Sequence, residues 1–175
     1  MGHFTIREPR PDDAAALGRI HVRAWQTGYR NGLMPDDYLD GLSVDERAQM
    51  WRDAVEAPPR PRRAHLTAAD DNDTPVGFIL VGPAEGDDGA DEGEVYALNV
   101  DPDVWGQGAG RALLDAGTDA LADAGFTDLV LWVHRDAERS RAFYEHNGWQ
   151  PDGAERTQDV LGVEVPEVRY RRTVP

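Results

Sequence analysis

The sequence predicts an α/β fold in which strands and helices alternate along the chain and pack in layers. Residues 3–8 alternate apolar and polar side chains, which is typical of a strand. Residues 17–25 instead repeat apolar side chains at every third or fourth position, as one face of a helix does. The run 129–133 is almost continuously apolar, as expected of a strand covered on both faces. Read in order, the elements are roughly β-α-α-β-β-β-α-β-α-β-β.

The N-terminal third is predicted to form one strand followed by helices. After the strand 3–8, Pro11-Asp12-Asp13 indicates a helix start with an aspartate at the cap. The helix that follows has one apolar face, made by Leu17, Ile20, His21, Ala24 and Trp25. A second Pro-Asp-Asp opens residues 35–57, which predict one or two more helices, and the proline-rich stretch 58–61 ends them.

The remainder is predicted to alternate strands with two helices. Residues 83–93, rich in Gly, Asp and Glu, indicate a mobile loop rather than a linker between domains. The other elements are a weak strand at 62–69, a turn at 70–75, strands at 76–82 and 94–100, a helix at 108–124 closed by Gly125, a strand at 129–133, a helix capped by Asp136 that ends near Asn147-Gly148, and one or two strands within 160–173.

Length and composition suit one folded domain over residues 3–173. A chain of 175 residues with 40% hydrophobic content can bury one sizeable core. It has no cysteine, which excludes disulfides, thiolate metal sites and a cysteine nucleophile, and its five histidines are scattered without metal-ligand spacing. We therefore expect no metal. There is no apolar run of about 18 residues and no signal peptide, so we expect a cytoplasmic protein.

The chain is strongly acidic, with a formal net charge of −15, and its 18 basic residues are all arginine. Such a field disfavours nucleic acid and anionic membrane surfaces as partners, and it attracts cations such as a protonated amine. A salt-adapted or merely well-solvated surface is the alternative explanation of the same charge.

A glycine-rich turn between a strand and a helix is the strongest functional signal. Residues 100–114 run from a strand through Gly106, Gly108 and Gly110 into a helix. The free N–H groups at a helix start, together with the helix dipole, bind anions such as a pyrophosphate, and glycine lets the backbone approach them. A dinucleotide-binding turn would need Gly or Ala where Arg111 stands, and a P-loop would need a lysine that the chain lacks.

A second signal lies about thirty residues further on, in residues 139–149. The stretch predicts an amphipathic helix with a glycine stop and an aromatic residue after it. Within it, Tyr144 is either a core tyrosine or a catalytic phenol, and the helix pattern alone leaves both open.

Together, Gly-Gln-Gly-Ala-Gly-Arg-Ala-Leu-Leu and the later Phe-Tyr-Glu-x-x-Gly-Trp resemble the GCN5-related N-acetyltransferase (GNAT) superfamily. Ile-Arg-Glu-Pro-Arg-Pro-Asp-Asp near the N-terminus and Ala-Trp-x-x-x-Tyr-Arg at 24–30 also resemble its bacterial and archaeal members. The resemblance implies a mixed, mostly antiparallel seven-stranded sheet with helices on both faces, split near 94–100 and 129–133. It also implies acetyl-CoA as the acyl donor.

The resemblance further implies roles for individual residues. Tyr144 would act as general acid near the thioester sulfur, and Glu94 stands where some members place a general base. The cofactor-binding residues would be Leu98, Asn99 and Val100 along the pantetheine arm, and Gln107, Gly108, Ala109, Gly110 and Arg111 around the pyrophosphate. The N-terminal helical part would form the acceptor wall, and its aromatic residues are Trp25, Tyr29, Tyr38 and Trp51; at least half of them are expected to be ordinary core aromatics.

Two positions depart from the family pattern. Trp105 stands where Gln or Arg usually opens the first motif, and Ala137 stands where an asparagine often bonds the cofactor arm. We expect the cofactor to bind nevertheless. His134 follows a strand at its C-terminal end, where α/β sites often form, whereas His21 on an apolar helix face is expected to be a core histidine.

The sequence therefore predicts an N-acetyltransferase that moves an acetyl group from acetyl-CoA to a primary amine by direct attack, with no covalent enzyme intermediate. The alternatives are another acyl-CoA donor or a hydroxyl acceptor on the same fold, and a CoA-binding module without turnover. The expected partner is a small-molecule or peptide amine, without nucleic acid or membrane, and a homodimer is left open.

Overall fold

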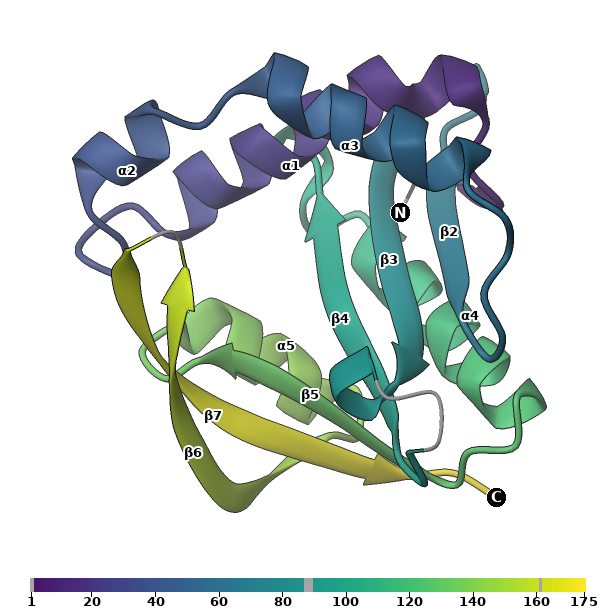
Figure 1. The fold of residues 1–175 in the computed structure, drawn as a ribbon, viewed down its shortest axis with the longest axis vertical. Helices are drawn as coiled ribbons and strands as arrows, with labels where there is room; N and C mark the ends of the chain where they lie inside the picture. The colour runs from purple at the N-terminus through teal and green to yellow at the C-terminus, as the bar shows by residue number, and fades with distance from the viewer. Residues whose placement is uncertain (1, 87–89, 161) are drawn as a thin grey trace.

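The computed structural model describes residues 2–86, 90–160 and 162–175, and their strands form one seven-stranded sheet (Figure 1). The strands are β1 (Thr5–Arg7), β2 (Ala64–Ala69), β3 (Pro75–Pro83), β4 (Gly93–Val100), β5 (Asp128–His134), β6 (Gln150–Val160) and β7 (Val163–Thr173). Their order is β1-β2-β3-β4-β5-β7-β6, with β4 and β5 parallel and the other neighbours antiparallel. The predicted mixed, mostly antiparallel sheet is confirmed.

Helices cover both faces of this sheet, as the sequence predicts. They are α1 (Ala14–Gly28), α2 (Asp36–Asp40), α3 (Val44–Glu56), α4 (Ala109–Asp123) and α5 (Glu138–His146), with short 3₁₀ turns at Pro11–Asp13, Ala84–Gly86 and Pro102–Val104. On one face, Leu17 of α1 and Trp51 of α3 pack on Phe78 of β3. The core on the other face packs α4 and the aromatic residues around α5 against the sheet. No helix in the described residues has the length and apolarity that crossing a bilayer requires.

The sheet splits between its two parallel strands. β4 pairs with β5 at three positions, Gly93–Val95 against Leu129–Leu131, after which the strands diverge (Figure 1). On its other edge, β4 stays paired with β3 as far as Val100. The β3 register shifts between Leu80, opposite Ala97, and Val81, opposite Val95, which leaves Tyr96 as an extra residue. Such a bulge bends the strand and increases its twist, so β4 turns away from β5 where their pairing ends.

An ion-pair cluster ties the first helix to the loop before α4. The Arg23 guanidinium lies 2.6 Å from the Asp101 carboxylate and 3.1 Å from that of Asp103. The Asp101 carboxylate also accepts the Asp103 N–H at 3.0 Å, and the Asp101 N–H donates to the Val76 carbonyl. The turn that begins the glycine-rich loop is therefore held from α1 and from β3.

Two aspartates that the sequence predicts as helix caps have carboxylates with other partners. Asp13 stands at the N-cap position of α1, as predicted, but its carboxylate accepts the Arg10 N–H at 2.7 Å and pairs with Arg7 at 2.7 Å, so it fixes β1 against the 3₁₀ turn. Asp136 precedes the cap residue of α5, Ala137, and its carboxylate pairs with Arg135 at 3.2 Å. In both cases an arginine side chain competes with the helix N–H groups for the aspartate carboxylate.

The boundaries of two other predicted segments also differ. The final strands begin at residue 150 instead of 160, because β6 is an edge strand whose mostly exposed, polar side chains carry little apolar signal. Of the predicted mobile loop 83–93, residues 84–86 form a 3₁₀ turn and residue 93 belongs to β4, while residues 87–89 lie outside the described part of the chain.

The excess negative charge predicts a salt-dependent stability. With a net charge of −15, repulsion within the folded chain is screened by salt, with a Debye length of about 10 Å at 0.1 M. We expect the melting temperature to rise between low and molar NaCl. Calorimetry across a NaCl titration checks this, and a flat or falling curve would show that the ion pairs on the surface outweigh the repulsion.

Candidate active site

The glycine-rich turn leaves a row of backbone N–H groups free at the start of α4. Gly108 precedes the helix at φ +98° and Gly106 lies at φ +79°, both in the left-handed region that favours glycine. The first helical N–H bonded to this turn is that of Ala112, to the Gly108 carbonyl. The N–H groups of Gly108, Ala109, Gly110 and Arg111 have no acceptor among the described residues. With the positive end of the helix dipole, these groups fit the pyrophosphate of coenzyme A.

The loop before α4 and the beginning of α5 form two sides of one site. A Cβ on Gly110 would lie 3.4 Å from the Phe143 ring, so the helices approach closely there. The Trp105 indole N–H donates to the Val100 carbonyl at 2.8 Å, and the Arg139 guanidinium carbon lies 3.8 Å from the centroid of the same indole. The Val100 carbonyl is therefore already hydrogen-bonded. Leu98 and Asn99 lie on the part of β4 that does not pair with β5.

Tyr144 lies on α5 within a cluster of aromatic rings. Its ring packs beside Phe143, Trp149 and Tyr170, at centroid distances of 5.2, 6.4 and 6.3 Å. Burial, together with the neighbouring Tyr29, raises the pKa of the Tyr144 phenol above its usual value. The hydroxyl makes no hydrogen bond within the described residues, so Tyr144 remains a neutral phenol whose proton is available to a ligand.

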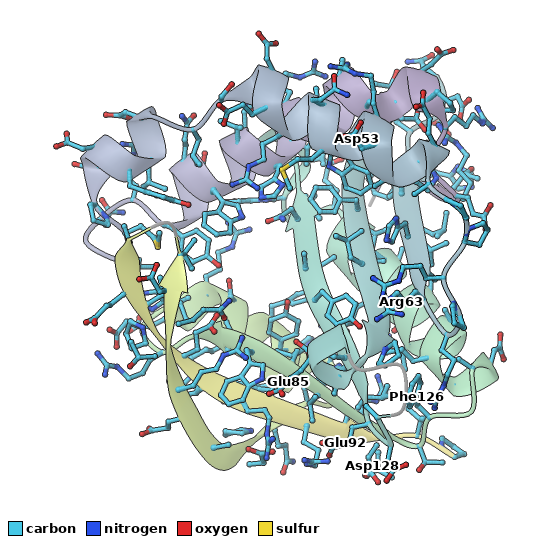
Figure 2. The ribbon with its side chains drawn as sticks, viewed as in Figure 1. Asp53, Arg63, Glu85, Glu92, Phe126 and Asp128 are labelled. Carbon is cyan, nitrogen blue, oxygen red and sulfur yellow. The ribbon has the colours of Figure 1, made fainter. Side chains whose placement is uncertain are left out.

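Glu94 lies within the short paired stretch of the two parallel strands, opposite Val130 and one residue before their pairing ends. It is buried, 7% exposed, and its carboxylate accepts the Glu85 N–H at 2.6 Å. Burial is the main reason that the pKa of Glu94 is raised; Arg156 lowers this pKa, and the negative charges of Glu85 and Glu167 raise it. Figure 2 shows Glu85 on the short turn in front of the split. A buried carboxyl with a raised pKa has the character of a proton acceptor at neutral pH.

Three aromatic rings spaced four residues apart, His21, Trp25 and Tyr29, pack in a row along α1 and its C-cap. Trp25 lies 5.7 Å from the ring of His21 and 5.0 Å from that of Tyr29. Burial raises the pKa of Tyr29 to about 12, and burial together with Arg47 lowers the pKa of His21 to about 4, so both are neutral at pH 7. His21 also packs 5.7 Å from Phe78, which fits the predicted core histidine. Of the other two aromatic residues in this part of the chain, Trp51 on α3 is buried against Phe78 of β3, and Tyr38 packs in the cluster around Leu39.

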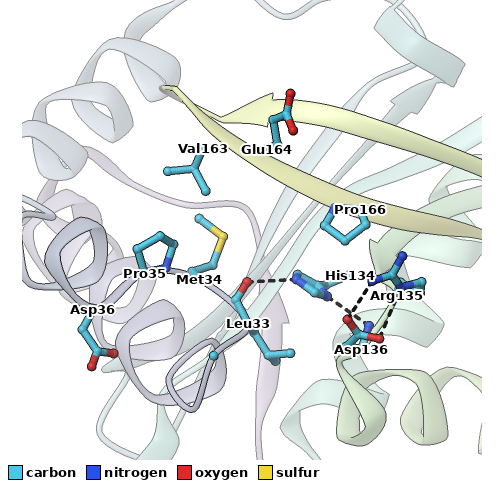
Figure 3. A pocket seen from close by; sticks show the side chains of 11 residues that line it. Leu33, Met34, Pro35, Asp36, His134, Arg135, Asp136, Val163, Glu164 and Pro166 are labelled. Carbon is cyan, nitrogen blue, oxygen red and sulfur yellow. Dashed lines mark hydrogen bonds and ion pairs between the residues drawn. The ribbon is translucent and has the colours of Figure 1, made fainter.

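His134 is fixed by the protein itself. Its Nε2 lies 2.9 Å from the Leu33 carbonyl, and its Nδ1 accepts the Asp136 N–H at 3.0 Å (Figure 3). This pattern requires the neutral tautomer with the proton on Nε2, and both nitrogens are then occupied. A pocket of about 510 Å³ lies beside it, between residues 32–36 and the hairpin of β6 and β7. His134 therefore links the end of β5 to the loop that follows α1, and it has no nitrogen left for a ligand.

The predicted site residues come from β4, from the start of α4 and from α5. Arg111 is the weakest of the predicted cofactor ligands, because its side chain is 70% exposed and lies 3.8 Å from Asp115 on the next helical turn. Sequence patterns did not reveal Arg156 and Glu167, which pair at 2.8 Å near Glu94. They come from the two strands of a polar hairpin that carries no motif. The described residues hold no cluster of histidine and carboxylate side chains suited to a metal.

A split sheet with an anion-binding helix start beside the split defines a coenzyme A-dependent acyltransferase. The chain belongs to the acetyltransferase (GNAT) family, whose model matches residues 19–149. It is 30% identical over 165 residues to the uncharacterized N-acetyltransferase YuaI of Bacillus subtilis, covering 94% of this chain and 90% of YuaI. It is also 44% identical over 149 residues to a mycothiol acetyltransferase of Propionibacterium freudenreichii, covering 85% of this chain but only 42% of that protein.

Solved structures share the fold. The PaiA N-acetyltransferase of Thermoplasma acidophilum, in complex with coenzyme A, superposes with a TM-score of 0.70 at 18% identity, covering 98% of this chain and 99% of that one. YncA of Salmonella typhimurium, with acetyl-CoA, gives a TM-score of 0.70 at 20% identity, covering 98% and 94%. The protein is an acetyl-CoA-dependent acyltransferase.

The turn at Gly108 gives a direct test of the anion site. Gly108→Asp should lower CoA affinity at least about tenfold, equivalent to ~1.4 kcal/mol, because it places a carboxylate against the pyrophosphate. The left-handed backbone at Gly108 strains any side chain, so Gly108→Asn, of similar shape and without charge, is the matched control. Calorimetric titration with CoA compares the two variants, and equal affinities would contradict an anion site at this turn.

Proposed function

We propose that the protein transfers an acetyl group from acetyl-CoA to a primary amine by direct attack of the amine. The observation that carries this proposal is an interaction between tyrosines of opposite faces. Tyr29 follows the last residue of α1 and Tyr144 lies on α5, helices that pack on opposite sides of the sheet, yet Tyr29 contributes to the raised pKa of Tyr144. The two side chains would then approach each other where β4 and β5 have parted. A donor thioester and an acceptor can therefore meet there from the two faces.

The residues around the split divide the proton chemistry. Glu94 would take a proton from the acceptor amine on its way to attack, since a neutral amine is the nucleophile. Tyr144 would give a proton to the departing thiolate, because its phenol stays protonated. No residue needs to carry the acetyl group, which agrees with the absence of cysteine.

A thiol-release assay with acetyl-CoA across an acceptor panel tests the proposal. The panel holds a simple primary amine, a diamine, an amino acid, an amino sugar and a peptide with a free N-terminus, each matched with its N-acetylated form. We expect thiol release with at least one free amine and none with its acetylated partner. Release that requires a hydroxyl compound, or CoA binding without release on any acceptor, would contradict amine transfer.

Three further predictions belong with this proposal. We propose that residues 3–173 form a single domain and that the enzyme acts in the cytoplasm on a small-molecule or peptide amine. A homodimer remains a prediction that sedimentation can check.

A further inference from the structure

Arg139, in the first turn of α5, is a cation with no carboxylate partner among the described residues. Elsewhere in the described chain, arginines form ion pairs with carboxylates. Among them are Arg7, Arg23, Arg30, Arg156, Arg169 and Arg171. No carboxylate within the described ranges lies at ion-pair distance from Arg139, although acidic residues are nearly twice as numerous as basic ones. Its contact is with the ring of Trp105, 3.8 Å from the guanidinium carbon.

The indole under Arg139 is itself held in place. The Trp105 N–H donates to the Val100 carbonyl at the end of β4, and the Trp105 backbone N–H donates to Pro102. A guanidinium stacked on an aromatic face keeps the N–H donors at its edge available, and these donors match the oxygens of a phosphate. Stacking on Trp105 therefore orients Arg139 as a phosphate ligand and still leaves its hydrogen-bonding edge open.

The place of this pair in the fold points to the donor molecule. Trp105 immediately precedes Gly106 in the turn whose free N–H groups fit a pyrophosphate, and Arg139 comes from the helix on the other side of that site. The chain has a net charge of −15, which repels a ligand with several phosphate charges, so a local cation is needed to offset that field. Arg111, the other cation at the turn, points mostly into solvent and lies near Asp115.

We propose that Arg139 binds a phosphate group of the nucleotide half of coenzyme A, and that Trp105 is the positioning residue that holds it. The Trp105–Arg139 pair then supplies from α5 the contact that Arg111 is poorly placed to make. The inference rests on coenzyme A as the donor, and it is independent of the identity of the acceptor.

Calorimetric titration of Arg139→Gln with coenzyme A tests the cation directly. Affinity should fall about tenfold or more, equivalent to at least ~1.4 kcal/mol, and Arg139→Lys should restore part of it. Arg52→Gln on α3 makes the same change in net charge away from the site and should bind CoA like the wild type. Dephospho-CoA, which lacks the 3′-phosphate, identifies the group that is bound. An equal loss with both ligands indicates the pyrophosphate, and a loss with CoA alone indicates the 3′-phosphate; either supports the proposal.

The double variant tests the role of Trp105. Trp105→Leu should weaken CoA binding although it removes no charge, and adding it to Arg139→Gln should cause little further loss, because both changes remove one interaction. Wild-type affinity in Arg139→Gln, with CoA binding intact, would overturn this inference and leave the proposed function standing. Failure of the wild type to bind CoA would overturn both, and full additivity in the double variant would overturn the positioning role of Trp105.

Discussion

Tyr144→Phe should lower kcat by about 10²–10⁴-fold and leave CoA affinity nearly unchanged. The thiolate that departs in acyl transfer has a conjugate thiol pKa of about 8.5 if it resembles cysteine, so a nearby phenol can protonate or hydrogen-bond it as charge develops. The substitution keeps the ring that packs against Phe143 and Trp149 and removes only the hydroxyl. Stability should therefore change little, because that hydroxyl has no partner among the described residues.

A second tyrosine provides the matched control. Tyr170 packs beside Tyr144 and is fully buried, but its hydroxyl bonds Arg141 at 2.9 Å and Glu145 at 3.1 Å. Tyr170→Phe should therefore reduce the melting temperature and leave kcat near the wild-type value. Steady-state kinetics and thermal melts on both variants separate the two roles. A kcat for Tyr144→Phe within twofold of wild type would return Tyr144 to the core.

Glu94→Gln should reduce kcat/KM by about 10²-fold near neutral pH, the lower end of the contribution that a general base makes. Gln keeps an oxygen that can accept the Glu85 N–H, so the turn at 84–86 should persist. Burial raises the pKa of Glu94, and the carboxylate is the form that accepts a proton. Wild-type activity should therefore rise with pH as Glu94 ionises, and the deficit of the variant should shrink at high pH, where the acceptor amine is already neutral.

The neighbouring Glu85 offers a check on this assignment. Its charge contributes to the raised pKa of Glu94, and its side chain is exposed. Glu85→Gln should leave the plateau rate unchanged and move the acidic limb of the pH profile to lower pH. Profiles of kcat/KM for the three proteins decide the matter: a deficit of Glu94→Gln that stays constant across pH would exclude Glu94 as the base.

Periodicity predicted most of the fold because most elements bury one face. Leu17 and Ile20 of the predicted α1 stripe and most of the apolar run of β5 are buried, as the sequence predicts. β6 was placed ten residues late because an edge strand with exposed side chains shows no alternation of apolar residues. The predicted cap at Asp136 is wrong, because a carboxylate that pairs with an arginine looks the same in a sequence as a carboxylate that caps a helix.

The candidate site was likewise predictable from the sequence only in part. Local patterns locate the turn at Gly108 and the helix of Tyr144, since a short segment alone must supply a free helix start or an amphipathic face. Trp105 and Arg139 lie 34 positions apart, and only the fold brings them together. The environment of Glu94 likewise depends on Arg156 and Glu167 from a hairpin whose sequence is merely polar.

The short pairing between β4 and β5 makes the sheet mechanically soft along one line. Beyond three paired residues, no backbone pairing joins the β1–β4 part of the sheet to the β5–β7 part among the described residues. A molecule bound between these two parts of the sheet replaces the missing backbone hydrogen bonds, so its binding free energy also opposes their separation. At a concentration 100 times its Kd, such a molecule adds about 2.7 kcal/mol to the free energy of unfolding. Amide hydrogens along the diverging part of β4 should then exchange far more slowly. A bound substrate would in this sense complete the stabilisation of the sheet.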